Sequence, residues 1–152
     1  MTNFQRTAQW LAACGKEPGN TKHFSVQVGC HIEEVVELLT SIETDFTDEE
    51  LPLIGTALGT LTHAAQALKA GDRHARVSKP LEFLDGLCDC EVTGNGLAFL
   101  AGMNKDGADQ AVLASNDSKL FEGRAMFHPG GKIAKPAAWV APNLTPFLKA
   151  TP

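Results

Sequence analysis

Three glutamates within five residues form the first group in this chain whose types and spacing could do chemistry. Glu33, Glu34 and Glu37 lie in the stretch CHIEEVVELL. On an α-helix they fall within roughly a third of a turn, with apolar side chains on the far side. Like charges at this spacing repel, so the helix gains nothing from them unless a cation lies between them. The group is therefore either a solvated acidic face or a cation-binding site.

A second acidic stripe follows further along the chain. Glu82, Asp85 and Asp89 are spaced i, i+3, i+7 and share one side of a helix, whereas Glu91 projects elsewhere. The rest of the circumference is apolar: Leu81, Phe83, Leu84, Leu87, Cys88, Val92, Leu97, Phe99 and Leu100. A helix that is apolar nearly all round is normally buried, so we expect a buried helix whose acids need a cation or a partner.

Together the two stripes predict a metal site. Two helices that offer carboxylates to one place supply oxygen ligands only, which favours Mg²⁺, Mn²⁺ or Ca²⁺. Zinc is not favoured, because no cluster of cysteine and histidine has ligand spacing.

Length and composition indicate one ordinary globular domain over residues 1–152. Hydrophobic residues make up 43% of the chain and charged residues 20%, and the net charge of -5 argues against a nucleic-acid partner. The N-terminus lacks the pattern of a signal peptide, and no apolar run approaches the ~20 residues of a membrane span. The four cysteines include no C-x-x-C pair, which fits buried thiols in a reducing compartment. We therefore expect a cytoplasmic protein without a membrane partner.

Capping and turn residues predict about five helices and no useful β-alternation. Thr2 caps the first helix, Thr47 to Glu50 reads as a capping box, Gly71 ends a helix and Ser78 begins another. The expected helices run from Thr2 to about Cys14, from between Thr21 and Ser25 to about Ser41–Glu43, over Leu51–Ala70, from Ser78 to about Gly102, and from about Ala108 to Ser118. Residues 104–107 read as a turn. The fold class is thus all-α, a helical bundle.

The clearest periodic signal lies in the third expected helix, where apolar residues follow a strict 3-4 spacing: Leu51, Ile54, Leu58, Leu61, Ala65 and Leu68. This pattern predicts helix packing on helix, with Gly55 and Gly59 permitting a close approach. Gly86, Gly94 and Gly96 inside the fourth helix suggest a packing reason, since glycine is costly there. Residues 120–152 show no period but carry aromatic residues. We expect an extended C-terminal arm that packs on something; the alternative is a disordered tail, against which the aromatic residues argue.

The order of these motifs resembles a known family. Glu33-Glu34-x-x-Glu37 followed by Glu82-x-x-Asp85 resembles the E-E-x-x-E … E-x-x-D signature of the all-α nucleoside triphosphate pyrophosphohydrolases, the MazG-like enzymes. That superfamily includes phosphoribosyl-ATP pyrophosphohydrolases and dimeric-dUTPase-like members. Residues 115–119 look like the S-N-x-S-K element of a phosphoribosyl-ATP-pyrophosphohydrolase-like subgroup. Similar tail residues are Gly131-Lys132, Lys135-Pro136 and Trp139-x-x-Pro142-x-Leu144, so the likeness extends from about Gln27 onward.

The resemblance implies Mg²⁺-dependent (or Mn²⁺-dependent) hydrolysis of a nucleoside triphosphate, such as dUTP, to the monophosphate and pyrophosphate. The implied metal ligands are Glu34, Glu37, Glu82, Asp85 and Asp89, and the implied catalytic set is Glu33, Glu34, Glu37, Glu82 and Asp85. Glu34, Glu37 and Asp85 are expected to bind the metal directly, with Glu33 or Glu82 orienting the water or completing the ligand shell. Asp89 is an extra ligand, or takes the place of the last aspartate.

Substrate contacts and assembly follow from the same resemblance. Asn116 and Lys119 are expected to contact phosphate or sugar. Independently of the resemblance, Gln27 lies within two turns of Glu34 on roughly the same side of the helix, so it either reaches a ligand there or is an ordinary exposed glutamine. The family also implies a homodimer or a dimer of dimers.

Two other classes of protein remain open. One is a non-catalytic helical interaction or nucleotide-binding protein whose acids are only a surface feature. The other is a ferritin-like di-metal protein, which needs E-x-x-H on two helices. Here His31-Ile32-Glu33-Glu34 reverses that order and has no second copy.

Overall fold

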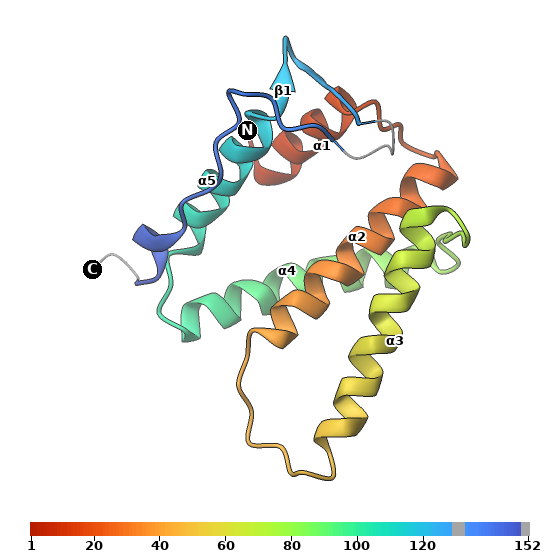
Figure 1. Cartoon of the computed structure of the whole chain (residues 1–152), viewed down its shortest axis with the longest axis vertical. Helices are drawn as coiled ribbons and strands as arrows, with labels where there is room; N and C mark the ends of the chain where they lie inside the picture. Colours follow the sequence, from red (N-terminus) through yellow and green to blue (C-terminus); the bar gives the residue numbers. More distant parts are fainter. Residues whose placement is uncertain (129–132, 150–152) are drawn as a thin grey trace. The chain divides into compact units, whose positions relative to one another are not determined.

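A computed structural model of the chain describes residues 1–128 and 133–149 and confirms the all-α fold (Figure 1). Five α-helices lie in these ranges: α1 (Asn3–Ala13), α2 (Thr21–Thr40), α3 (Leu51–Ala70), α4 (Pro80–Leu100) and α5 (Lys105–Asp117). A two-stranded hairpin, β1 (Leu120–Phe121) with β2 (Arg124–Ala125), and one 3₁₀ turn, η1 (Thr145–Phe147), follow in the C-terminal arm. The predicted number of helices is thus confirmed.

The chain divides into two compact units, and each is described by itself. The first unit combines Met1–Lys16 with Lys79–Pro152 and so contains α1, α4, α5 and the arm. The second unit is Glu17–Ser78, which contains α2 and α3.

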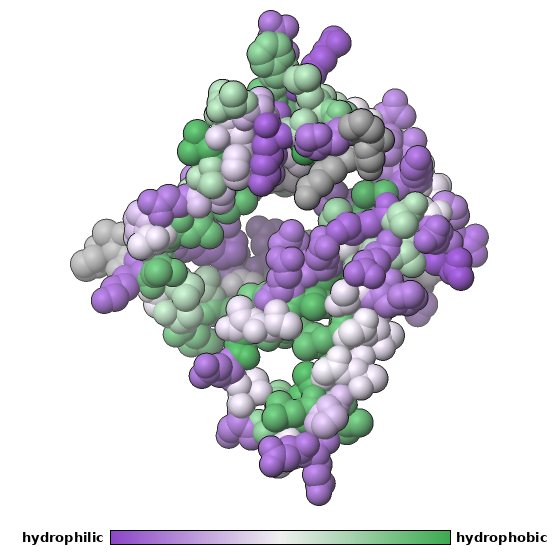
Figure 2. Space-filling model, in the orientation of Figure 1, coloured by the Kyte–Doolittle hydropathy of each residue, from purple (hydrophilic) through white to green (hydrophobic). Residues whose placement is uncertain are grey.

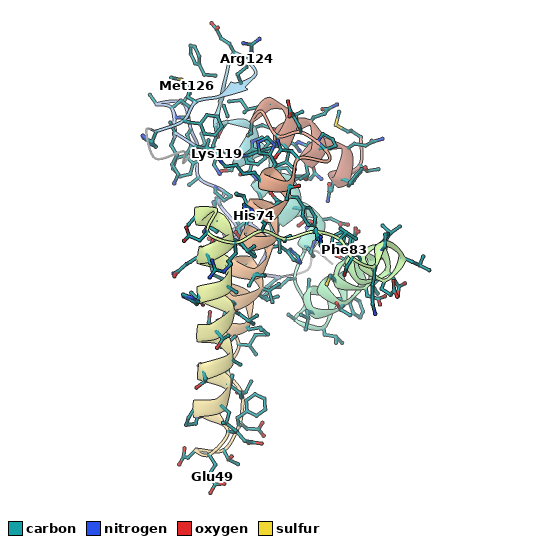
Figure 3. The ribbon with its side chains drawn as sticks, turned by 90° about the vertical axis from the view of Figure 1, so that its right-hand side faces the viewer. Glu49, His74, Phe83, Lys119, Arg124 and Met126 are labelled. Carbon is teal, nitrogen blue, oxygen red and sulfur yellow. The ribbon has the colours of Figure 1, made fainter. Side chains whose placement is uncertain are left out.

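The second unit is an antiparallel helical hairpin, with Glu49 and His74 at its opposite ends in Figure 3. The Asn20 side chain caps α2 by accepting from the backbone N–H of His23. The predicted capping box is present before α3: the backbone N–H of Thr47 donates to the Glu50 carboxylate, and the N–H of Glu50 donates to Thr47 Oγ1. Gly71 ends α3 in the left-handed conformation, at φ 86°. These local signals were therefore predicted correctly.

The two helices of the hairpin come closest at Gly29 and Ala65. A Cβ added at Gly29 would lie 2.8 Å from the Ala65 carbonyl oxygen, and Ala65 is only 2% exposed. The prediction that Gly55 and Gly59 permit the close approach is wrong, because a Cβ at either would meet nothing within 4 Å. Helix packing on helix is observed, but another glycine permits it.

In the first unit, α1 packs on α5. Thr2 caps α1 as predicted, in a full capping box with Gln5. The α5 helix begins at Lys105, capped by the Asn104 side chain, so the turn expected over residues 104–107 is instead the first turn of the helix. Asn104 is a good N-cap, and this capping role outweighs its preference for turns.

The α4 helix differs from its prediction in three ways. It begins at Pro80 with Lys79 in the N-cap position and no side-chain cap, so Ser78 does not cap it. It is not buried, since every residue from 80 to 93 is exposed and Leu81 retains 78% of its accessible surface. A Cβ at Gly86, Gly94 or Gly96 would meet nothing within 4 Å, so these glycines have no packing partner in the part of the chain that the structure describes.

The C-terminal arm is mostly irregular, as expected, but begins with the short hairpin β1–β2. Glu122 and Gly123 in its two-residue loop have positive φ, 49° and 75°, which is the geometry of a type I′ turn. Further along, the Phe147 ring lies over α5 so closely that a Cβ at Gly107 would be 2.5 Å from it. The predicted Gly131-Lys132 motif lies outside the described residues.

Large apolar side chains remain at the surface of both units. In the hairpin, Leu53 is exposed near the start of α3, and Figure 2 shows apolar side chains at this end of the molecule. The hydrophobic residues buried within the described residues are Cys14 and Ala65. The packed interior is therefore small in each unit.

Candidate functional site

The acids of α2 have two different environments. Glu33 is half-buried, and both of its carboxylate oxygens accept hydrogen bonds from Lys69 Nζ at 2.6 Å. Glu34 and Glu37 are exposed, and neither side chain has a hydrogen bond or ion pair with another described residue. The predicted stripe is therefore present, but one of its three carboxylates is already paired.

Lys69 is a residue that the sequence analysis did not single out. Its hydrogen bond to Glu33 raises its pKa, desolvation opposes that rise, and the Glu33, Cys30 and Glu34 charges support it. Lys69 lies four residues after Ala65, which belongs to the apolar stripe of α3. Residues at this spacing share one face of a helix, and this was the only feature of the sequence that placed Lys69 on the face that packs on α2. It supplies a cationic partner to one of the three α2 acids, Glu33.

The acids of α4 lie on one side of an exposed helix. The side chains of Glu82, Asp85 and Asp89 are exposed and make no hydrogen bond or ion pair with other described residues. Their spacing is as predicted, but the expected burial of these acids is wrong. They are exposed to solvent, so an incoming ion can reach them.

The donor set fits the expected class of metal, but the described residues do not gather a complete site. Carboxylate oxygens at helical spacing suit Mg²⁺ or Mn²⁺. Among the described residues, no group of three or more histidine, cysteine, aspartate or glutamate side chains is arranged to hold a metal ion. The α2 stripe belongs to one unit and the α4 stripe to the other. A shared metal site thus stays a prediction.

The serines of the S-N-x-S-K element bind the C-terminal arm. Ser115 Oγ donates to the carbonyl of Val140 at 2.7 Å, and Ser118 Oγ accepts from the Val140 N–H at 3.1 Å. Ser115 is only 6% exposed. The two hydroxyls thereby satisfy both backbone groups of one arm residue, which is a structural role for half of the motif.

Asn116 and Lys119 lie together at the end of α5, close to α1. Lys119, labelled in Figure 3, donates from Nζ to Asn116 Oδ1 at 2.8 Å. Its Nζ lies 6.0 Å from the centre of the Trp10 ring. The Trp10 indole N–H donates to the Asn116 carbonyl, which fixes the ring beside the pair. The structure thus brings two predicted substrate contacts together. Gln27 is exposed on α2 and belongs to the other unit.

A surface groove of about 560 Å³ adjoins this part of the first unit, and Arg6, Trp10 and Asp117 are among its lining residues. Arg6 is fixed there by Asp117, which accepts from its guanidinium at 2.6 Å. The groove is of the size that accommodates small ligands. Neither Arg6 nor Trp10 was predicted to contribute to a site, because only the tertiary packing of α1 on α5 places them near the motif.

The cysteines are all outside disulfides, as expected. Cys14 is buried and its pKa is raised by desolvation, against the opposing charges of Lys16 and Lys119. Cys88 and Cys90 are exposed, which contradicts the expectation of buried thiols.

Comparison with known proteins adds no assignment. No protein-family model, no curated protein and no solved structure matches the chain. Within the described residues, none of the helices is both long enough and apolar enough to span a membrane.

Proposed function

We propose that this protein is a Mg²⁺-dependent nucleotide pyrophosphohydrolase that converts a nucleoside triphosphate to the monophosphate and pyrophosphate. The proposed metal ligands are the carboxylates of the two stripes, Glu34, Glu37, Glu82, Asp85 and Asp89. Bound Mg²⁺ would neutralise phosphate charge and lower the pKa of a water. Mn²⁺ is expected to substitute for it.

The observation that carries this proposal is the state of those five carboxylates. Each is exposed on a long helix, and none has a hydrogen bond or ion pair with another described residue. Like charges at neighbouring helical positions are destabilising, so a cation would relieve a repulsion that the chain itself leaves in place.

The chain's own residues have distinct roles in this proposal. Either Glu33 or Glu82 would orient the attacking water, and the other would complete the ligand shell. Lys119 and Asn116 would contact phosphate or sugar, since a lysine ammonium is a suitable partner for phosphate oxygens. Arrival of an anion would require Lys119 to exchange its contact with Asn116 for one with the ligand.

Location and partners belong to the same proposal. A cytoplasmic location gives access to nucleoside triphosphates, and the net charge of -5 disfavours nucleic acid as a partner. A homodimer or a dimer of dimers is proposed as the assembly.

The test is product analysis by chromatography. Incubation of the full chain with common ribo- and deoxyribonucleoside triphosphates plus Mg²⁺ should release monophosphate and pyrophosphate from at least one of them, and omission of Mg²⁺ should stop the reaction. Release of diphosphate and free phosphate, or no turnover of any nucleotide, would refute the proposal.

A non-catalytic interaction protein with the same surface acids is separated from the enzyme by thermal melting. Mg²⁺ bound at a specific site raises the melting temperature with the logarithm of its concentration. Purely surface acids give no such dependence beyond the effect of ionic strength, which NaCl at matched ionic strength measures.

A further inference from the structure

The contact between Lys69 and Glu33 is the one tertiary ion pair of the hairpin unit within the described residues. The ammonium lies 2.6 Å from both carboxylate oxygens, and the two residues are 36 positions apart in sequence. Neighbouring Glu34 and Glu37 have no such partner there. Within the α2 stripe, Glu33 is therefore held in an ion pair, whereas Glu34 and Glu37 are not.

Helix geometry explains why these two side chains meet. Side chains on an α-helix lean toward its N-terminus. Because α2 and α3 are antiparallel, Lys69 leans along the hairpin toward Glu33, and Glu33 leans back toward Lys69. The backbone arrangement of the two helices therefore favours this contact.

The absence of a side chain at Gly29 leaves space for the Lys69 side chain. A Cβ added at Gly29 would lie 2.9 Å from Lys69 Cγ, as well as 2.8 Å from the Ala65 carbonyl oxygen. The missing side chain thus serves two purposes: it permits the close approach of the helices and leaves room for the methylene stem of Lys69. Glu33 lies one turn after Gly29 on α2, where the ammonium emerges.

We propose that Lys69 is a positioning residue that holds Glu33 as the water-orienting carboxylate and keeps it out of the metal-ligand set. Glu34 and Glu37 are then the α2 carboxylates left for Mg²⁺. This inference rests on the proposed function, and it assigns different tasks to three glutamates that the sequence does not distinguish.

Two other roles for Lys69 make different predictions. If Lys69 contacts substrate phosphate, its loss raises KM and leaves kcat unchanged. If Lys69 only stabilises the hairpin, its loss lowers the melting temperature and reduces metal binding and turnover together. If Lys69 is a positioning residue, its loss should raise the affinity for Mg²⁺ and lower kcat.

The experiment compares Lys69→Met, Lys69→Arg and the control Lys22→Met in the full chain. Lys22 is an exposed lysine on α2. Mg²⁺ affinity is measured by calorimetry without nucleotide, and kcat and KM are measured on the nucleotide found by product analysis. Melting temperatures are recorded without metal.

Lys69→Met should bind Mg²⁺ about threefold to tenfold more tightly, because a positive charge has been removed and Glu33 released. Its kcat should fall at least about tenfold, with KM changed less than about threefold, since an interaction that matters only in the transition state is lost. Lys69→Arg should retain both properties, because a guanidinium also pairs with both oxygens of a carboxylate. Lys22→Met should match the wild type. A raised KM at constant kcat, or weaker Mg²⁺ binding in Lys69→Met, overturns the proposal.

A metal-free double-mutant cycle separates this inference from the proposed function. Lys69→Met, Glu33→Gln and the double variant are melted without Mg²⁺ or nucleotide. Non-additive changes establish the ion pair even if no nucleotide is hydrolysed. In that case the proposed function fails, and the water-orienting role of Glu33 fails with it, whereas the contact between Lys69 and Glu33 stands. Additive changes show that the pair is absent in solution, and the positioning role fails even if the enzyme is active.

Discussion

The three glutamates of α2 show how much one cation changes the chemistry of a side chain. Glu33 has its negative charge compensated by Lys69, whereas Glu34 and Glu37 face solvent without a hydrogen-bonded partner among the described residues. Glu34 and Glu37 are also three positions apart and repel each other across one turn. Their charge is therefore available to a bound ion, and the protein is destabilised slightly while none is present.

The first residue-scale prediction concerns Glu37→Gln, which keeps the shape of the side chain and removes one charge. The metal-free variant should be as stable as the wild type, or more stable by about 0.2–0.5 kcal/mol, because a like-charge pair is relieved. Its Mg²⁺-induced rise in melting temperature should shrink, and turnover should be lost. Differential scanning fluorimetry over a Mg²⁺ series and the pyrophosphate assay measure these effects.

Glu43→Gln, the same substitution in the loop that follows α2, is the control for Glu37→Gln and should leave turnover intact. Wild-type turnover together with a wild-type Mg²⁺ response in Glu37→Gln would show that Glu37 is not part of the site.

A second residue-scale prediction concerns acid stability. Backbone and side-chain hydrogen bonds from Thr47 lower the pKa of the Glu50 carboxyl below its ordinary range. A carboxyl with a lowered folded-state pKa stabilises the fold above its unfolded pKa, and that contribution is lost as the pH falls through the folded pKa. Glu50→Gln should therefore melt with a smaller drop between pH 7 and acidic pH than the wild type.

Glu49→Gln removes a neighbouring charge that has no capping contact, so it should keep the wild-type drop in melting temperature. Equal drops in all three proteins would mean that the capping box does not contribute to the acid sensitivity.

Secondary-structure elements were predictable where the signal is local. The caps at Thr2 and at Thr47 to Glu50 and the stop at Gly71 each involve residues within four positions of one another, so the sequence displays the whole interaction. The same locality placed the acids of α2 and α4 on helices with the expected spacing.

Features that depend on distant residues were missed. Lys69 meets Glu33 across the hairpin, and Ser115 and Ser118 bind Val140 more than twenty residues away. Each partner is an ordinary residue in its own segment, so no local pattern marks the contact. Gly29 was overlooked for the same reason, because its partner Ala65 lies on another helix.

An element-scale prediction tests the docking of the arm on α5. Gly107→Ala would place a Cβ 2.5 Å from the Phe147 ring and should displace the ring. We expect a destabilisation of about 1–3 kcal/mol from overpacking, reduced by the gain in helix propensity of up to about 1 kcal/mol. Thermal melting measures the change, and limited proteolysis should cleave the arm of the variant faster.

Gly86→Ala is the control for Gly107→Ala, since it is the same substitution inside α4 where a Cβ meets nothing within 4 Å. It should stabilise the chain by about 0.5–1 kcal/mol. An arm that is no more susceptible to protease in Gly107→Ala than in Gly86→Ala would argue against the docked position of Phe147.

At the scale of the whole molecule, the exposed apolar surface is the feature that needs an explanation. On α4, residues spaced i, i+3, i+7 and i+11 form one apolar stripe: Leu81, Leu84, Cys88 and Val92. Leu81 and Val92 are 78% and 68% exposed. A contiguous exposed apolar stripe on a soluble monomer usually marks an interaction surface. This stripe runs beside the acids Glu82, Asp85 and Asp89, so whatever covers it also lies next to the proposed ligands.

We predict that a second copy of the chain covers this stripe. Light scattering at micromolar concentration should give at least twice the chain mass of 16.2 kDa. Replacing both Leu84 and Val92 with glutamine should shift the mass toward that of one chain, because association would then bury polar amides in place of apolar groups. Phe4→Gln, which removes an even more exposed apolar side chain from α1, should leave the mass unchanged.

Since a covering partner would exclude water from the carboxylates of α4, the monomeric variant should also bind Mg²⁺ more weakly than the wild type. A wild-type mass of one chain would refute the dimer, and the stripe would then be an exposed surface of a monomer.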